Sequence, residues 1–214
     1  MGSFLTVLEW IGTLSFALSG AMIGYEKRMD LFGVSVLGLV TACGGGLVRD
    51  LLLGRVPPLI FTRPAFPLAA MLVAASLFLP AVRGAIERHS HLYEMVQRVA
   101  DSVGLGAFTA AGVSAAMAAG FADTGLFFTV FIAVLTACGG GVLRDVLAGL
   151  PPYIFVKHIY ACAAIAGAIL CALLWQPLGA ETAMAVCVGL VFAIRMLAAK
   201  YRWSLPRAAG VVGK

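Results

Sequence analysis

The residues best suited to chemistry in this sequence belong to a ten-residue segment that occurs twice. Residues 41–50 read TACGGGLVRD, and residues 136–145 read TACGGGVLRD. Each copy has three successive glycines one helical turn before an Arg-Asp pair. Charged side chains in an apolar segment are costly and commonly mark a functional site. The candidate site residues are the threonine, the glycines and the charged pair of each copy: Thr41, Gly44, Gly45, Gly46, Arg49, Asp50, Thr136, Gly139, Gly140, Gly141, Arg144 and Asp145.

The glycine triplets have two interpretations. Glycine weakens a helix by about 1 kcal/mol relative to alanine. We expect both helices to kink or break at the triplets, which would free backbone carbonyls for cations and backbone amides for anions. The alternative is that the glycines only allow another helix to cross closely.

The Arg-Asp pairs also have two interpretations. Adjacent residues point about 100 degrees apart on a helix. We therefore expect each charged group to bond to a neighbouring helix or to water, rather than to the next residue. The pairs either line a pathway for polar solutes or act as a clamp, with the arginine on carbonyls and the aspartate capping another helix.

The composition indicates that these segments lie in a membrane. The chain is 62% hydrophobic and 12% charged, with a mean hydropathy of +1.01, whereas a soluble domain carries about 25% charge. Seven runs approach the roughly 20 residues of a membrane span. They lie at about 10–25, 31–48, 64–82, 102–122, 124–143, 159–180 and 182–199. We expect an all-α membrane protein with seven transmembrane helices and almost no domain outside the membrane.

The basic residues predict the orientation of these helices. Ten of them fall in the odd-numbered connections and the C-terminal segment, and two fall in the even-numbered connections. The positive-inside rule then places the N-terminus outside and the C-terminus in the cytoplasm, and this distribution argues against a nucleic-acid partner. The first run lacks the basic flank and the cleavage site of a secretory signal, so we expect it to be retained. The ten are Lys27, Arg28, Arg83, Arg88, Arg98, Lys157, Lys200, Arg202, Arg207 and Lys214, and the two are Arg55 and Arg63.

The repeated segment belongs to a longer internal repeat. Ten of 14 positions are identical between residues 41–54 and 136–149, and a double proline follows each copy. Residues 4–82 and 99–175 therefore form two copies of a three-helix unit. Because three spans is an odd number, the second copy enters the membrane from the opposite side, which makes an inverted repeat. The seventh helix, 180–200, has no counterpart and either locks the halves together or covers a flank.

The sequence contains no catalytic constellation. It has no HExxH, P-loop or GxSxG motif, and its five cysteines lack metal-ligand spacing. We expect a protein that is not an enzyme and that has no metal and no cofactor, apart from the ions it passes and any bound lipid.

These motifs resemble the prokaryotic branch of the trimeric intracellular cation (TRIC) channels. The resemblance rests on Gly-Gly-Gly-x-x-Arg-Asp in both copies, each followed by Gly and Pro-Pro, and on the seventh helix; it covers residues 4–200. It implies an inner-membrane homotrimer with a pore in each subunit. The pore would run between the two repeats, beside helices kinked at the triplets, and would pass potassium and sodium. Animal members carry Lys-Glu-Val in the second helix, where this sequence has Gly-Leu-Val-Arg-Asp.

A second function fits the same residues. The same signature occurs in a widespread family of bacterial inner-membrane proteins, some of which are described as glycine transporters. Inverted repeats with broken helices are typical of secondary transporters. An arginine for a carboxylate and an aspartate for an ammonium group would suit a small zwitterion such as glycine.

Overall fold

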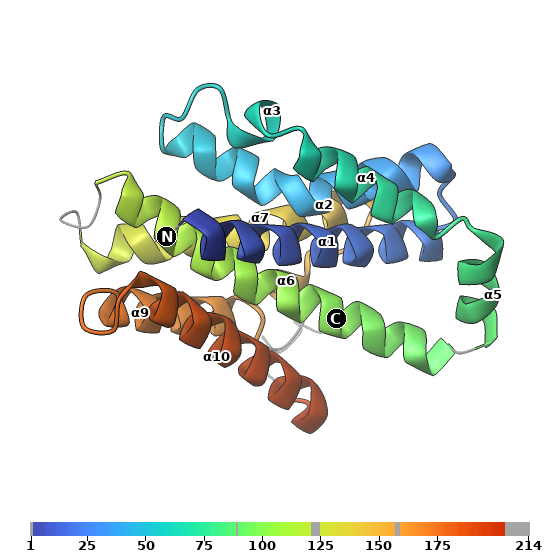
Figure 1. Ribbon diagram of the computed structural model, residues 1–214. Coiled ribbons are helices and arrows are strands. Elements are labelled where there is room, and N and C mark those ends of the chain that lie inside the picture. The colour runs from blue at the N-terminus through green and yellow to red at the C-terminus, as the bar shows by residue number, and fades with distance from the viewer. Residues whose placement is uncertain (1, 89, 121–124, 157–158, 204–214) are drawn as a thin grey trace, which may run out of the picture.

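The computed structural model describes residues 2–88, 90–120, 125–156 and 159–203, and these residues form an all-helical structure (Figure 1). Five of its helices, α1, α2, α6, α7 and α10, are long and apolar enough to cross a membrane. The protein is therefore a multi-pass membrane protein. In chain order the helices are α1 (Gly2–Glu26), α2 (Leu31–Leu52), α3 (Leu59–Thr62), α4 (Ala65–Ser76), α5 (Pro80–Arg88), α6 (Ser90–Ala118), α7 (Leu126–Leu147), α8 (Tyr153–Val156), α9 (Ala161–Leu174) and α10 (Ala180–Tyr201).

The third and sixth predicted spans are shorter than expected. The helix α4 has 12 residues and α9 has 14, which correspond to about 18 and 21 Å against a hydrocarbon core of about 30 Å. Each follows a double proline and a four-residue helix, α3 or α8. Because proline restricts the preceding residue to extended conformations, each of these segments begins with a non-helical connection in place of the first turns of a long helix.

The region between the expected spans 64–82 and 102–122 is helical where the structure describes it. The helix α5 covers its first part, and α6 begins at Ser90, well before the expected run at 102–122. Two charged residues of this region, Glu94 and Arg98, lie on an exposed face of α6. The hydroxyl of Tyr93 donates a 2.7 Å hydrogen bond to the carbonyl of Met22 and ties this early part of α6 to α1.

The helices form two groups that pack in equivalent ways. The helix α1 packs on α2 and α4, and α6 packs on α7 and α9. The helices α1 and α6 lie side by side near the centre of the molecule (Figure 1). Gly12 lies against Phe108, and Gly104 lies against Phe16. Because residue numbers rise along one helix as they fall along the other, α1 and α6 are antiparallel and make reciprocal contacts.

The glycine triplets lie where α2 and α7 cross. Both helices run through their triplets without interruption, so the expected break is wrong. A side chain on Gly45 would collide with the backbone carbonyl of Thr136, and one on Gly140 with the carbonyl of Thr41. The glycines therefore bring two helix backbones into direct contact, which replaces the packing lost with their side chains.

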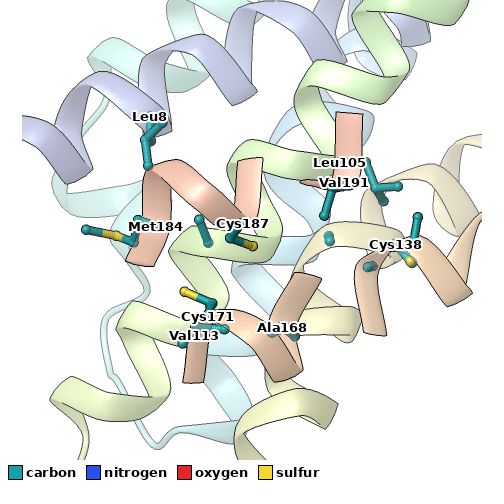
Figure 2. Close-up of a cluster of buried hydrophobic side chains, with 14 of the residues drawn as sticks. Leu8, Leu105, Val113, Cys138, Ala168, Cys171, Met184, Cys187 and Val191 are labelled. Carbon is teal, nitrogen blue, oxygen red and sulfur yellow. The ribbon is translucent and has the colours of Figure 1, made fainter. Parts of the chain in front are cut away.

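The helix α10 covers the flank of the second group. It packs on α6 and α9. Figure 2 shows Cys187 of α10 and Cys171 of α9 in one buried cluster with Leu105 and Val113 of α6. The last helix was expected either to lock the two halves together or to cover a flank. Its contacts favour the second role.

Substituting alanine at the crossing should destabilise the protein. Gly140→Ala places a methyl group against the Thr41 carbonyl, and overpacking of this kind costs about 1–3 kcal/mol. Gly46→Ala is the matched control, because the nearest atom to its new methyl group is Arg49 Nη2 at 3.8 Å. Thermal unfolding of the purified protein in detergent should show a lower midpoint for Gly140→Ala alone. Equal midpoints would contradict the close crossing.

Candidate functional site

The charged residues of each motif pair directly with one another. Arg49 Nε donates to Asp50 Oδ1 at 2.9 Å, and Arg144 Nε donates to Asp145 Oδ1 at 2.8 Å. The expectation that adjacent residues would not pair is wrong, but Arg144 also bonds to neighbouring helices as expected. The side chains of adjacent residues leave the helix in different directions, but an arginine side chain is long enough to turn its planar guanidinium group toward its neighbour.

The second oxygen of each aspartate caps the segment after the double proline. The amide of Leu59 donates to Asp50 Oδ2 at 2.9 Å, and the amide of Tyr153 donates to Asp145 Oδ2 at 2.8 Å. These amides open α3 and α8, where helices leave backbone donors unsatisfied. Both aspartates are therefore clamps, as one of the two interpretations predicted.

The first motif borders an open pocket, the first site, with a volume of about 70 Å³. Its lining includes Gly46, Arg49 and Asp50 from α2 and Glu9 from α1. Glu9 also pairs with Arg63 at 3.2 Å. Two arginines and two carboxylates thus surround the first site. The remaining lining is mostly apolar: Thr13, Ala42, Cys43, Leu47, Leu59, Ile60 and Phe66.

The second motif lies in a closed network, the second site. Arg144 Nη1 donates at 2.9 Å to Asp101 of α6 and at 2.9 Å to Ser19 of α1. Arg195 of α10 approaches Asp101 at 3.7 Å, and its guanidinium carbon lies 4.7 Å from the centre of the Tyr160 ring. The side chain of Arg144 is 0% exposed. Such burial is tolerable because carboxylates and hydrogen bonds surround the charge.

The two sites lie at different depths. Glu9 belongs to the first site and Ser19 to the second, and both are on α1. Ten helical residues separate them by about 15 Å along the helix. The antiparallel packing of the groups thus places the Arg-Asp pairs toward opposite ends of the bundle.

The predicted site residues divide into two sets. Thr41, Gly44, Gly45, Thr136, Gly139 and Gly140 belong to the crossing of α2 and α7. The hydroxyls of Thr41 and Thr136 donate to carbonyls of their own helices at 2.6 Å. Gly46 and Gly141 instead stand beside the guanidinium groups, with Arg49, Asp50, Arg144 and Asp145.

Several site residues were not predicted from the sequence. Glu9 and Asp101 occupy matching places in the two repeats, and Arg195 is the single charge in the last apolar run. These charges could have been recognised as site residues from the sequence, because an isolated charge in a membrane span needs a partner. Ser19 and Tyr160 carry no such signal, since single hydroxyls are common in apolar helices.

Comparisons with known proteins agree with this architecture. A sequence model of a family described as "Glycine transporter" matches residues 6–81 and 98–176. The UPF0126 inner membrane protein YadS of Escherichia coli strain K12 is 36% identical over 198 residues, which cover 92% of each chain. A structure of a prokaryotic TRIC channel in 0.5 M KCl matches with a TM-score of 0.85 and 30% identity, over 96% of this chain and 100% of that chain.

The TRIC orthologue from Rhodobacter sphaeroides matches with a TM-score of 0.80 and 32% identity, over 92% of this chain and 98% of that chain. The chain belongs to the prokaryotic TRIC family. This is a family of membrane channels or transporters and not of enzymes. The Gly-Gly-Gly-x-x-Arg-Asp motif of this TRIC family member serves both the helix crossing and the two charged sites.

Removing the charge of a clamp aspartate should destabilise the fold. Asp145→Asn weakens the partner of a fully buried arginine, and breaking a buried pair costs about 3–5 kcal/mol. Asp30→Asn is the control: Asp30 is an exposed N-cap that accepts from the Gly33 amide at 2.7 Å, and asparagine caps equally well. Thermal unfolding in detergent should separate the two variants by several degrees. Similar midpoints would show that the clamp is not needed for stability.

Proposed function

We propose that this chain is a channel for monovalent cations, chiefly potassium and sodium, in the bacterial inner (plasma) membrane. The observation that carries the proposal is the similarity to a prokaryotic TRIC channel in 0.5 M KCl, which extends over 96% of this chain at 30% identity. A likeness of this extent covers both three-helix repeats of this chain, and not only one of them.

The proposed pathway follows α1 from the first site to the second. The first site is an open vestibule inside the first group of helices. The second site is built by both groups, because Ser19 and Asp101 hold Arg144 together. Because Arg144 is buried between the two groups, the proposed gate is a rearrangement that withdraws the guanidinium from the path between the repeats. An arginine that faces such a path acts as an electrostatic barrier to cations.

The mixed charges of the first site suit the passage of cations. The positive charges of Arg49 and Arg63 balance the negative charges of Glu9 and Asp50. A cation therefore meets carboxylates at the first site, but no net negative charge binds it tightly. Conduction needs binding that is strong enough for entry and weak enough for exit. The helices α2 and α7 border this route with the small residues of their glycine triplets, and a kink at the triplets would widen it.

The assembly and the orientation are also part of the proposal. The chain forms a homotrimer with one pore in each subunit, as the name of the Rhodobacter sphaeroides channel suggests for that protein. Repeats 4–82 and 99–175 and helix 180–200 give seven membrane helices when α4 and α9 are counted. The N-terminus lies outside and the C-terminus in the cytoplasm, although Lys157, Arg207 and Lys214 lie outside the described residues. Its partners are lipids and permeant cations, without cofactor or nucleic acid.

Recording from purified protein in planar lipid bilayers tests the channel. Discrete openings should appear in KCl, and a KCl gradient should shift the reversal potential toward the equilibrium potential of potassium. Openings selective for chloride, or a complete lack of discrete openings from folded protein, would contradict the proposal.

A carrier of a small zwitterion such as glycine is the second candidate. The family description "Glycine transporter" and the two arginines and two carboxylates at the first site favour it. Proteoliposomes loaded with unlabelled glycine should then accumulate labelled glycine by counterflow. A carrier shows this exchange, with saturation, without discrete single-channel openings.

Filling the first site should reduce conduction. Cys43→Trp places a large side chain in the pocket that Cys43 lines, so we expect unitary conductance to fall several-fold. Cys162→Trp is the matched control, because Cys162 is exposed on α9. Single-channel recording of both variants, after a check that each elutes like the wild type, measures the effect. Unchanged conductance in Cys43→Trp would place the pathway elsewhere.

A further inference from the structure

The two charged sites receive their second arginine from unrelated parts of the chain. In the first site Arg63 comes from the connection between α3 and α4, and 49% of its side chain is exposed. In the second site Arg195 comes from α10, the helix without a counterpart in the repeat, and its side chain is 7% exposed. The position that matches Arg63 in the second repeat is Lys157, which lies outside the described residues.

The second site also gathers polar atoms that lack hydrogen-bond partners. In the part of the chain that the structure describes, Arg144 Nη2, Arg195 Nε, Tyr160 Oη and Asp101 Oδ2 are buried without such partners. Buried polar groups of this kind are normally satisfied by water or by a solute. Four of them occur together in the second site.

Gly141 lies beside this group of polar atoms. A methyl group on Gly141 would lie 3.4 Å from Tyr160 Oη and 3.7 Å from Arg144 Nη2, with no closer neighbour outside its own helix turn. The glycine thus faces a hydroxyl and a guanidinium group. At the equivalent place in the first repeat, Gly46 opens directly into the first site. Both glycines therefore border the same proposed route.

We propose that Arg195 sets the rectification of the channel, meaning the ratio of its currents at opposite voltages. This inference rests on the proposed channel function. Arg195 adds a positive charge to the inner part of the route, beside Asp101, and Arg63 adds one to the outer part, beside Glu9. A fixed charge near one end of a pathway changes the local concentration of permeant ions at that end.

The direction of the effect follows from the depths of the two sites. Without the charge of Arg195, Asp101 attracts cations at the inner site and favours current that starts from that side. Without the charge of Arg63, Glu9 attracts cations at the outer site, so current that starts from the outer side is favoured. The buried Arg195 acts with little screening, whereas salt screens the exposed Arg63.

Single-channel current–voltage curves of Arg195→Gln, Arg63→Gln and the double variant test the inference. At 0.15 M KCl each single variant should change the rectification ratio by about threefold relative to the wild type. The double variant should be more symmetric than either single variant, whatever the orientation of the protein in the bilayer. At 1 M KCl the effect of Arg63→Gln should fade, and that of Arg195→Gln should persist.

Two controls separate charge from structure. Arg195→Lys retains the charge and should rectify like the wild type, whereas a structural role of the guanidinium would leave lysine as impaired as glutamine. Arg195→Met removes the charge with a similar apolar stem and replaces Arg195→Gln if that variant does not fold. If the uncharged Arg195 variants rectify like the wild type, the inference is overturned, but the channel function is not, because the wild type still conducts. A wild type without openings overturns the channel function and this inference together.

Discussion

Arginine inside an apolar bundle must have its charge balanced by a nearby carboxylate, and the rest of this structure is arranged around that requirement. Each motif arginine turns to the next aspartate, whose other oxygen holds the first amide after the double proline. This amide follows the double proline directly in both repeats. The Arg-Asp pair and the double proline therefore work as one unit.

The glycines meet a different requirement within the same motif. They let α2 and α7 approach until each backbone carbonyl of Thr41 and Thr136 lies against a glycine of the other helix. This crossing fixes the separation of the two groups of helices. The charged sites, one turn further along each helix, are held at set depths as a result. A motif that reads as one site in the sequence thus contains a structural part and a polar part.

The sequence predicted what depends on composition and on repetition. The apolar runs predicted the long helices. The match between 41–54 and 136–149 predicted that the two groups of helices would make equivalent contacts. It did not predict that both triplets would stay helical, because only contact with a second helix compensates for three glycines. The helical start of α6 was hidden by Glu94 and Arg98, which are exposed there. Arg195 stood out as a lone charge, but its partner Asp101 is nearly a hundred residues away.

The reciprocal contacts of Gly45 and Gly140 also constrain how such a protein could arise. They form only between units of opposite orientation, so an ancestral three-helix protein that paired in this way needed copies inserted both ways. Fusion of the two units into one chain removes the need for separate copies in both orientations. The fused molecule, however, presents nearly the same arrangement of helices to each side of the membrane. The helix α10 packs on α6 and α9, which both belong to the second group. It therefore makes the two faces of the bundle different.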